Sequence, residues 1–281
     1  MKELVLNNYK DGPLVAYEWD IHDPKHMVVL IHGIGEYAAR YNRVASEFNK
    51  NGIAVFSMDL KGHGISYGKR GHCAPRTEVF RDIDLLIEYA KDKHPDAPIV
   101  LYGHSMGGNI SLNYRYNGKL NSLMEGYIIS APWVTLVRPV PSYQYKSIKV
   151  LSKIFPQKTI SSKIDEKDLG NLKNVKGYNK DPLVHEKISF LCALEGFEIA
   201  KKMANNTITK TGEGSKKPML LMHGDADVVC SVVGSRQIKE NEGDICTYVE
   251  WEGLSHEIHN GGKISEGNEV IAKAIEWIQA L

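Results

Sequence analysis

Short apolar runs recur along the chain from Met27 to Trp251, and they alternate with longer segments in which apolar residues return at helical spacing. Most of these runs lead into a loop that contains glycine. Continuous apolar runs are typical of strands buried on both faces, as in a parallel sheet with helical crossovers. The pattern therefore predicts a mostly parallel, doubly wound α/β fold. The predicted strands read MVVLIHG, IAVFSMD, PIVLYGHS, GYIISAP, PMLLMHG and TYVEWEG.

Two further strands are predicted before the first of these runs. They cover Glu3–Leu6 and Val15–Trp19, and the turn sequence KDGP between them favours a hairpin. Among the intervening segments, Thr77–Lys91 and Asn268–Leu281 carry the most regular helical stripes of apolar residues. The first of these helices would connect two strands, and the second would end the chain.

The alternation stops between Ala131 and about Met203, where prolines and short helical pieces replace it. This region lies between two predicted strands, so an insertion that covers the carboxyl edge of the sheet is the simplest interpretation. Open α/β sheets bind their ligands at that edge. We therefore expect a core formed by residues 1–131 and 204–281 and a cap formed by residues 132–203.

One predicted helix of the cap, Tyr143–Phe155, is amphipathic. It can be interpreted in two ways: the apolar face packs on the protein while the lysines are solvated, or the helix meets an anionic lipid surface and delivers substrate from it. The apolar face holds Ile148, Leu151, Ile154 and Phe155, and the other face holds Lys146, Lys149 and Lys153.

Composition narrows the range of functions. With 281 residues, 42% of them hydrophobic, 25% charged and a net charge of +1, the chain lacks the basic surplus of a nucleic-acid-binding protein. The N-terminal residues lack the continuous apolar stretch of a signal peptide, so we expect a cytosolic protein. The four cysteines form no C-x-x-C pair, which indicates reduced thiols. No motif calls for a metal or another cofactor.

The sequence Gly103-His-Ser-Met-Gly107 follows a predicted strand and opens a predicted helix. This is the context of a nucleophile elbow, in which a serine is held on a sharp turn with its hydroxyl exposed above the sheet. The alternative is a glycine-rich helix start with a serine N-cap. On the first interpretation Ser105 is a nucleophile, and it then needs a base because a serine hydroxyl is weakly nucleophilic by itself.

In this type of fold the nucleophile, the acid and the histidine base follow one another along the chain. Four histidines follow Ser105 in the chain. Of these, His185 falls in the cap and His223 precedes the expected acid, which leaves two candidates for the base. His256 lies in the first loop after the last predicted strand and is preferred, with His259 as the alternative.

The acid should follow the strand PMLLM, where the loop HGDADVV offers Asp225 and Asp227. Its role is to accept the imidazole N–H and to stabilise the imidazolium that forms during catalysis. Asp225 directly follows a glycine and can close the turn through its own side chain, so Asp227 is preferred.

The tetrahedral intermediate of ester hydrolysis carries an oxyanion that needs preoriented donors. The expected donors are the backbone N–H of Met106, directly after the nucleophile, and an N–H of the loop HGIGE. In that loop Ile34 is preferred, because Gly33 and Gly35 on either side allow its amide to point into the site.

Six segments, in this order, resemble the monoacylglycerol lipases and related lysophospholipases of the α/β-hydrolase fold: HGIGEYAARY, DLKGHGISYGKRG, GHSMGGN, YNKDPL, HGDADVVCS and EGLSHEIH. The resemblance extends over nearly the whole chain. It implies a catalytic triad of Ser105, Asp227 and His256, with Ile34 and Met106 as oxyanion donors, in agreement with the assignments made from the residues.

The resemblance also implies a pocket for a glycerol head group and neighbouring cysteines. From spacing alone, the pocket residues Glu36 and Arg40 could equally form an ion pair at a helix start, and Cys192 and Cys230 could be ordinary core residues. The family's first motif usually reads GEH, so Tyr37 is a departure, and Val134–Gly177 shows no motif that would indicate acyl-chain length. The implied pocket residues are Glu36, Arg40, Tyr178 and His259, with Cys192 and Cys230.

The sequence therefore predicts a serine hydrolase that cleaves a monoacylglycerol, or a similar single-chain lipid ester, to fatty acid and glycerol through an acyl-enzyme. One alternative keeps the triad and changes the substrate to an aryl or cinnamoyl ester or a lysophospholipid. Another is a ligand receptor built on a hydrolase scaffold, because a fold does not determine a function.

Overall fold

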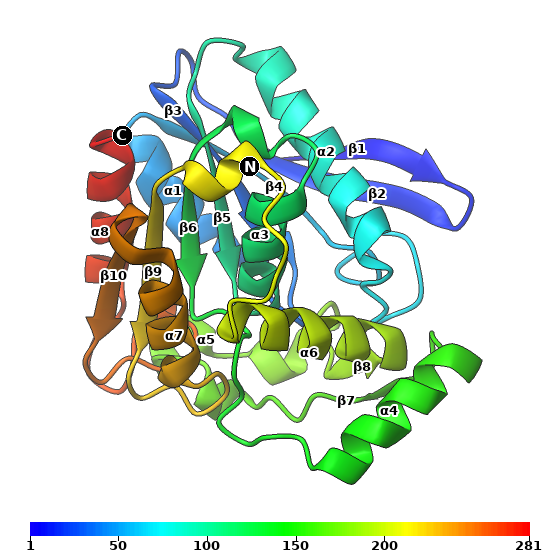
Figure 1. Ribbon diagram of the computed structural model, residues 1–281. Helices are drawn as coiled ribbons and strands as arrows, with labels where there is room; N and C mark the ends of the chain where they lie inside the picture. The colour runs from blue at the N-terminus through cyan, green and yellow to red at the C-terminus, as the bar shows by residue number, and fades with distance from the viewer.

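The computed structural model describes residues 1–281, and one eight-stranded sheet forms its centre (Figure 1). The strand order is β1-β2-β4-β3-β5-β6-β9-β10. From β4 to β10 all neighbouring strands are parallel, while the hairpin β1–β2 joins β4 antiparallel. The strands are β1 (Lys2–Tyr9), β2 (Gly12–Trp19), β3 (His26–Ile31), β4 (Ile53–Met58), β5 (Ile99–His104), β6 (Met124–Ser130), β9 (Met219–Gly224) and β10 (Cys246–Trp251).

Helices cover both faces of the sheet and enclose two separate apolar cores. One face packs against α1 (Asn42–Lys50) and α8 (Asn268–Gln279). The other packs against α2 (Arg76–Lys93), α3 (Met106–Asn117) and α7 (Val232–Glu242). Strands β3 to β6 and β9 are buried along almost their whole length, as their continuous apolar sequences predict.

The predicted α/β fold is confirmed, and each predicted strand and helix is present with small shifts at its ends. The hairpin strands are longer than predicted, because their pairing extends from Lys2 opposite Glu18 to Tyr9 opposite Gly12 and includes polar residues of the sheet edge.

The insertion between β6 and β9 lies at the carboxyl ends of the parallel strands. In Figure 1 the arrows of β5 and β6 point toward it. The expected end of the cap, at residue 203, falls within the last helix of the insertion, α6. The named elements of the insertion are α4 (Ser142–Ile154), β7 (Thr159–Ser161), α5 (Leu172–Val175), β8 (Lys187–Ser189) and α6 (Phe190–Ala204).

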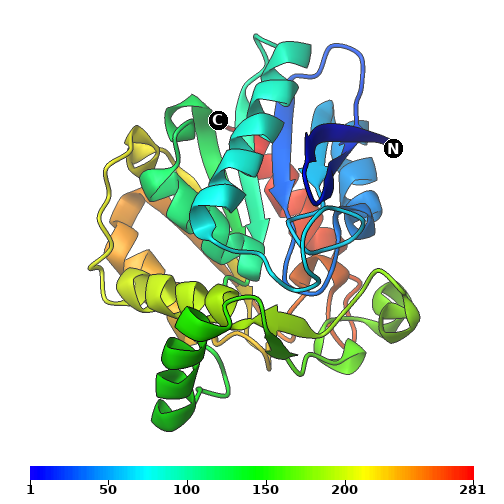
Figure 2. The ribbon, with the colours of Figure 1, turned by 90° about the vertical axis from the view of Figure 1, so that its right-hand side faces the viewer.

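Helix α4 projects away from the rest of the molecule in both views (Figures 1 and 2). Only part of its apolar stripe is covered: Ile148 is buried, whereas Ile154 and Phe155 are 60% and 52% exposed. Of the two interpretations of this helix, the one in which the apolar stripe packs against the protein therefore holds for Ile148 and in part for Leu151, but not for the C-terminal end of the helix.

The close contact between α3 and the sheet fixes the position of the turn before α3. A Cβ added to Gly107 would lie 2.1 Å from the backbone oxygen of Ile31 on β3. No larger residue fits there without a shift of the backbone. Helix α3 follows β5 in the chain but packs directly against β3. Ser105, just before this helix, is therefore close to the loop after β3.

Candidate active site

Ser105 occupies a strained turn between β5 and α3. Its φ and ψ are 55° and −115°, in a region that L-residues other than glycine seldom adopt. The strand before it and the helix after it match the expected nucleophile elbow. The serine side chain does not cap the helix, which removes the alternative interpretation of this motif as a plain N-cap.

The structure brings Ser105, His256 and Asp227 into one chain of hydrogen bonds. His256 Nε2 lies 2.8 Å from Ser105 Oγ, and His256 Nδ1 lies 2.7 Å from Asp227 Oδ2. The other oxygen of Asp227 accepts the backbone N–H groups of Val229 and Cys230 at 2.7 and 3.0 Å. These contacts orient the carboxylate toward the imidazole.

The two alternatives left open by the sequence lie elsewhere. Asp225 is exposed and accepts the backbone N–H of Gly253 at 2.7 Å, as a residue that closes a turn would do. His259 stacks on Tyr41, with their ring centroids 4.9 Å apart, and makes no contact with Ser105.

His223, excluded as the base by chain order, supports the acid. Its Nε2 lies 3.1 Å from Asp227 Oδ2, and its Nδ1 lies 2.7 Å from the hydroxyl of Ser235 on α7. Nε2–H then donates to the carboxylate while Nδ1 accepts from the serine. The motif HGDAD contains both partners, but nothing in the sequence distinguishes a supporting histidine from an unrelated one.

The electrostatic surroundings make His256 a stronger base than an ordinary histidine. Burial disfavours the charged ring, but the charge of Asp227 and its hydrogen bond outweigh burial and raise the pKa of His256. Burial also acts against ionisation of Asp227, but the charge of His256 and the hydrogen bonds from both histidines hold its pKa well below the usual range. Asp227 is therefore ionised across the neutral range.

Two backbone amides beside Ser105 have no acceptor within the protein. Met106 is the first residue of α3, so its N–H lacks an intrahelical partner. The N–H of Ile34, in the loop after β3, also makes no hydrogen bond. A Cβ added to Gly33 would lie 3.1 Å from Ser105 Cβ, which shows how closely this loop approaches the serine. The positive end of the α3 dipole favours negative charge at this position.

A second set of buried charges lies beside the triad. The guanidinium of Arg40 contacts Glu36 Oε2 at 2.6 Å and both carboxylate oxygens of Glu257 at 2.8 and 3.0 Å. Its carbon also lies 4.5 Å from the centroid of the Tyr178 ring, which comes from the insertion. Glu257 was not predicted: it lies within the segment EGLSHEIH, but neither its local sequence nor the resemblance implied a role for it.

The two carboxylates that share Arg40 differ in their ionisation. Burial raises the pKa of Glu36 to about 7; Arg40 counteracts this effect, and the negative charge of Glu257 adds to it. For Glu257, burial is outweighed by the charge and hydrogen bonds of Arg40, which hold the pKa of this carboxyl well below the usual range. Burial therefore acts against ionisation of Glu36 more strongly than against that of Glu257, which holds Arg40 through two hydrogen bonds.

The cavity in front of Ser105 is almost closed. Its volume is about 10 Å³, roughly the space of one water molecule. Glu36, Glu257 and His104 line it together with the loop Gly33–Ile34 and the triad residues Ser105 and His256. The insertion covers it with Ile164, Leu169 and Tyr178.

The remaining residues implied by the resemblance lie around this cavity but do not line it. The sulfur of Cys192 on α6 is 3.9 Å from the sulfur of Met106, and the Cys230 thiol lies beside the Ser105 hydroxyl. Both thiols are buried, and burial raises both pKa values, so they are un-ionised. Burial also lowers the pKa of His259 to about 3, so its ring is neutral. Tyr37, the departure from the family motif, donates to Asp181 of the insertion at 2.7 Å.

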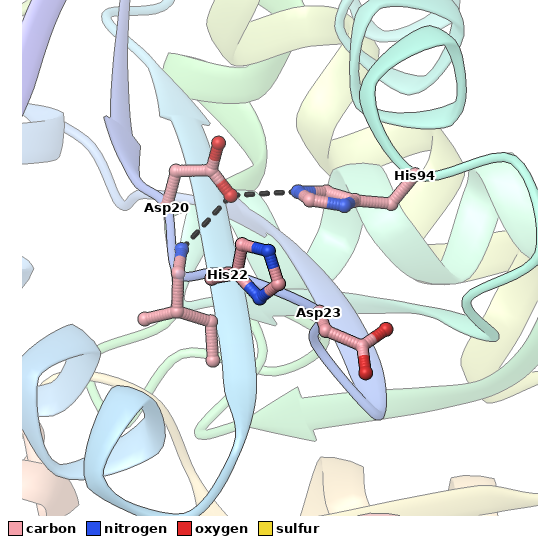
Figure 3. A pocket seen from close by; sticks show the side chains of 5 residues that line it. Asp20, His22, Asp23 and His94 are labelled. Carbon is pink, nitrogen blue, oxygen red and sulfur yellow. Dashed lines mark hydrogen bonds and ion pairs between the residues drawn. The ribbon is translucent and has the colours of Figure 1, made fainter.

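A second hollow lies at the opposite edge of the sheet (Figure 3). Its lining residues precede β3 and β5, and Asp20 contacts His94 Nε2 at 2.7 Å there. These acidic and histidine side chains are not arranged to hold a metal ion. Because open parallel sheets bind ligands at the carboxyl ends of their strands, this hollow is not the candidate active site.

The fold and the Ser105 site together define an α/β-hydrolase. The sequence profile described as "Serine aminopeptidase, S33" matches residues 22–262, and the chain belongs to this hydrolase family. A monoacylglycerol lipase of Mycolicibacterium smegmatis is 32% identical over 260 residues, which cover 91% of this chain and 89% of the relative. The resemblance found in the sequence is confirmed, and the protein is an enzyme of the carboxylic ester hydrolase class.

Two solved structures agree with this placement. The monoacylglycerol lipase of Paleococcus ferrophilus has a TM-score of 0.81 at 31% identity, covering 94% of this chain and 97% of that one. A soluble variant of the Saccharomyces cerevisiae monoglyceride lipase, solved with a substrate analog, has a TM-score of 0.83 and covers 96% and 92%. At 24% identity the second comparison shows the fold alone.

The contact between Asp227 and His256 can be tested by NMR titration of the His256 ring. Its pKa should lie above the ordinary value of 6.5, because the Asp227 charge outweighs burial. Asp227→Asn removes the main charge that opposes burial, so the pKa of His256 should fall clearly below its wild-type value. The control is Asp225→Asn, which changes an exposed carboxylate on the same loop and should leave the titration unchanged. Equal effects of the two substitutions would contradict the pairing.

Proposed function

We propose that the protein hydrolyses the ester bond of a monoacylglycerol, or of a similar single-chain lipid ester, to a fatty acid and an alcohol through an acyl-enzyme on Ser105. The observation that carries the proposal is the hydrogen-bonded series Ser105–His256–Asp227 facing two unpaired backbone amides. This arrangement provides a nucleophile, a base, an orienting acid and an oxyanion site in one place.

The steps of the reaction follow from these positions. His256 Nε2 takes the proton of Ser105 Oγ as the oxygen attacks the ester carbonyl, and Asp227 stabilises the imidazolium. The N–H groups of Ile34 and Met106 donate to the oxyanion, and each such donor is typically worth about 3–4 kcal/mol. His256 then protonates the leaving alcohol. A water molecule, activated by the same histidine, releases the acid from Ser105.

The substrate class is inferred from the cavity and from the relatives. Two of the matched proteins are named monoacylglycerol lipases, and this chain spans most of the length of both. The cavity is bordered by polar groups, including Glu36 and Tyr178, that suit free hydroxyls of a glycerol head group. A diacylglycerol would bring an acyl chain to these groups in place of a hydroxyl and leave them unpaired.

We assign residues 132–203 the role of a cap that opens and closes. Ile164, Leu169 and Tyr178 cover the cavity, which is too small for an acyl chain in this structure. Substrate entry therefore requires these residues to move away from Ser105. The backbone contacts to be broken include Glu257 N–H to the Leu169 oxygen at 2.6 Å.

A lipid surface is proposed as the place where the substrate is taken up. Residues 132–164 contain no aspartate or glutamate, so this part of the cap carries only positive charge. The same segment exposes large apolar side chains, among them Tyr143, Val150, Ile154 and Phe155 on or next to α4. Apolar and basic groups on one projecting helix suit an anionic membrane surface. The basic residues are Arg138, Lys146, Lys149, Lys153, Lys158 and Lys163. None of the helices is both long and apolar enough to cross a bilayer.

Substitution of the nucleophile tests the mechanism. Ser105→Ala should lower kcat for any ester at least about a thousandfold while leaving the melting temperature close to that of the wild type. A fluorophosphonate should label Ser105 in the wild type and nothing in the variant. Ser147→Ala, on the exposed helix α4, serves as the control and should keep full activity and labelling. Label on another serine would refute the assignment.

Head-group selectivity tests the substrate class. The kcat/KM for monoacylglycerols should exceed that for the matching diacylglycerols at least about tenfold, which corresponds to about 1.4 kcal/mol. Tyr178→Phe keeps the ring beside Arg40 and removes only the hydroxyl, so it should reduce this ratio a few-fold and leave a small activated ester unaffected. A wild-type ratio near one would instead favour an aryl ester or a lysophospholipid.

Co-sedimentation with anionic vesicles tests the lipid surface. The wild type should bind vesicles of mixed phosphatidylserine and phosphatidylcholine, and the substitution of Lys146, Lys149 and Lys153 by glutamate should abolish binding. The control makes the same charge change with exposed lysines of the core, Lys10 and Lys50 together with Lys216, and should still bind. Equal binding by both triple variants would contradict a role for α4.

A further inference from the structure

Glu257 connects the loop that carries His256 to Arg40. It is the residue next to His256, and its two carboxylate oxygens accept the two terminal nitrogens of Arg40 at 2.8 and 3.0 Å. Asn260 donates to the same carboxylate at 2.6 Å. Both oxygens of Glu257 are therefore engaged by the protein, although its side chain borders the cavity. A two-point contact of this kind fixes orientation as well as distance.

Arg40 also contacts Glu36, which in turn binds the loop after β3. It donates to Glu36 Oε2 at 2.6 Å, and Glu36 Oε1 accepts the backbone N–H of Gly33 at 2.6 Å. Tyr41 donates to the same oxygen at 2.9 Å. Gly33 directly precedes Ile34, whose amide is assigned to the oxyanion. The position of the Ile34 amide thus depends on where the Glu36 carboxyl is held.

We propose that Glu257 is a positioning residue. Through Arg40 and Glu36 it fixes the position of the Ile34 amide relative to His256, so that the oxyanion donor and the base keep a constant geometry. The inference rests on the proposed function of Ser105, His256 and Ile34.

Burial makes this connection rigid. The side chains of Glu36 and Glu257 are each 3% exposed and that of Arg40 is 13% exposed. An exposed ion pair exchanges with water and holds its partners loosely, whereas a buried, fully hydrogen-bonded one fixes their geometry. The cap also rests on this set, since the Tyr178 ring lies on Arg40 and the Leu169 oxygen accepts the N–H of Glu257.

The charge balance allows Glu257 to be replaced without leaving a buried cation unpaired. Two carboxylates share one guanidinium, so removal of Glu257 leaves Arg40 paired with Glu36 alone. Variants of Glu257 should therefore fold. The other titratable groups that face this set are Tyr41, Tyr102, His104, Tyr178, His256, His259 and Arg43.

The test compares Glu257→Gln and Glu257→Leu with the wild type on a small activated ester, after titration of active sites with a fluorophosphonate. Leucine removes both contacts to Arg40, and kcat per titrated site should fall on the order of thirty- to a hundredfold, somewhat less than complete loss of an oxyanion donor. Glutamine keeps one acceptor and should restore part of this loss. KM should change less than about threefold, because the contact acts on the transition state.

A double-variant cycle identifies the route. Arg40→Met interrupts the connection, so adding Glu257→Gln to it should cause no further loss of kcat. Additive losses would mean that Glu257 acts independently of Arg40 and would overturn the inference. The control is Glu250→Gln, which disrupts a bidentate pair with Arg236 on the surface and should leave kcat unchanged.

Two further outcomes are informative. If the Glu257 variants lose active sites but retain the wild-type kcat per titrated site, the glutamate only stabilises the fold, and the inference is overturned. If the wild type itself is not labelled on Ser105, the proposed function fails first. Label on Ser105 with unchanged kcat in Glu257→Leu rejects the inference alone.

Discussion

The turn at Ser105 is the constraint on which the geometry of the site depends. A positive φ at a residue with a side chain costs on the order of 1–3 kcal/mol, so the surrounding packing must hold it in place. That packing is the close contact of α3 with the backbone of β3 at Gly107. The same contact brings the loop after β3 against the serine, so the proposed nucleophile and one proposed oxyanion donor are positioned by a single arrangement of strand, turn and helix.

Buried charge around this turn is divided into two sets with separate tasks. Asp227 lies between His256 and His223, and in the proposed mechanism its negative charge stabilises the imidazolium form of His256. Arg40 lies between Glu36 and Glu257 and ties together the loops that carry the donor and the base. The other histidines beside the triad are neutral, because burial lowers the pKa of both His104 and His259. They fill space around His256 without adding charge.

The sequence predicted what depends on local pattern and chain order. Continuous apolar runs indicated the parallel strands, and the order of Ser105, Asp227 and His256 along the chain singled out three residues that the structure brings together. It did not predict the roles of His223 and Glu257. Glu257 pairs with Arg40, which is distant in the chain, and nothing in the sequence distinguishes His223 from the other histidines.

The cap was also harder to predict than the core. Apolar residues recur at helical spacing along its first helix, but this spacing does not tell which of them a neighbouring element covers. Ile148 is buried, whereas Ile154 is 60% exposed. Tyr178 was linked to the site only by family resemblance, since nothing in its local sequence indicates that its ring lies on Arg40.

The most direct test of the account is to identify the covalent intermediate by rapid-quench mass spectrometry with a long-chain monoacylglycerol. The account predicts that the peptide containing Ser105 gains the mass of the fatty acid minus water within the first turnover, and that Asp227→Asn slows both formation and loss of this adduct. Release of fatty acid over many turnovers with no adduct on Ser105 would contradict it.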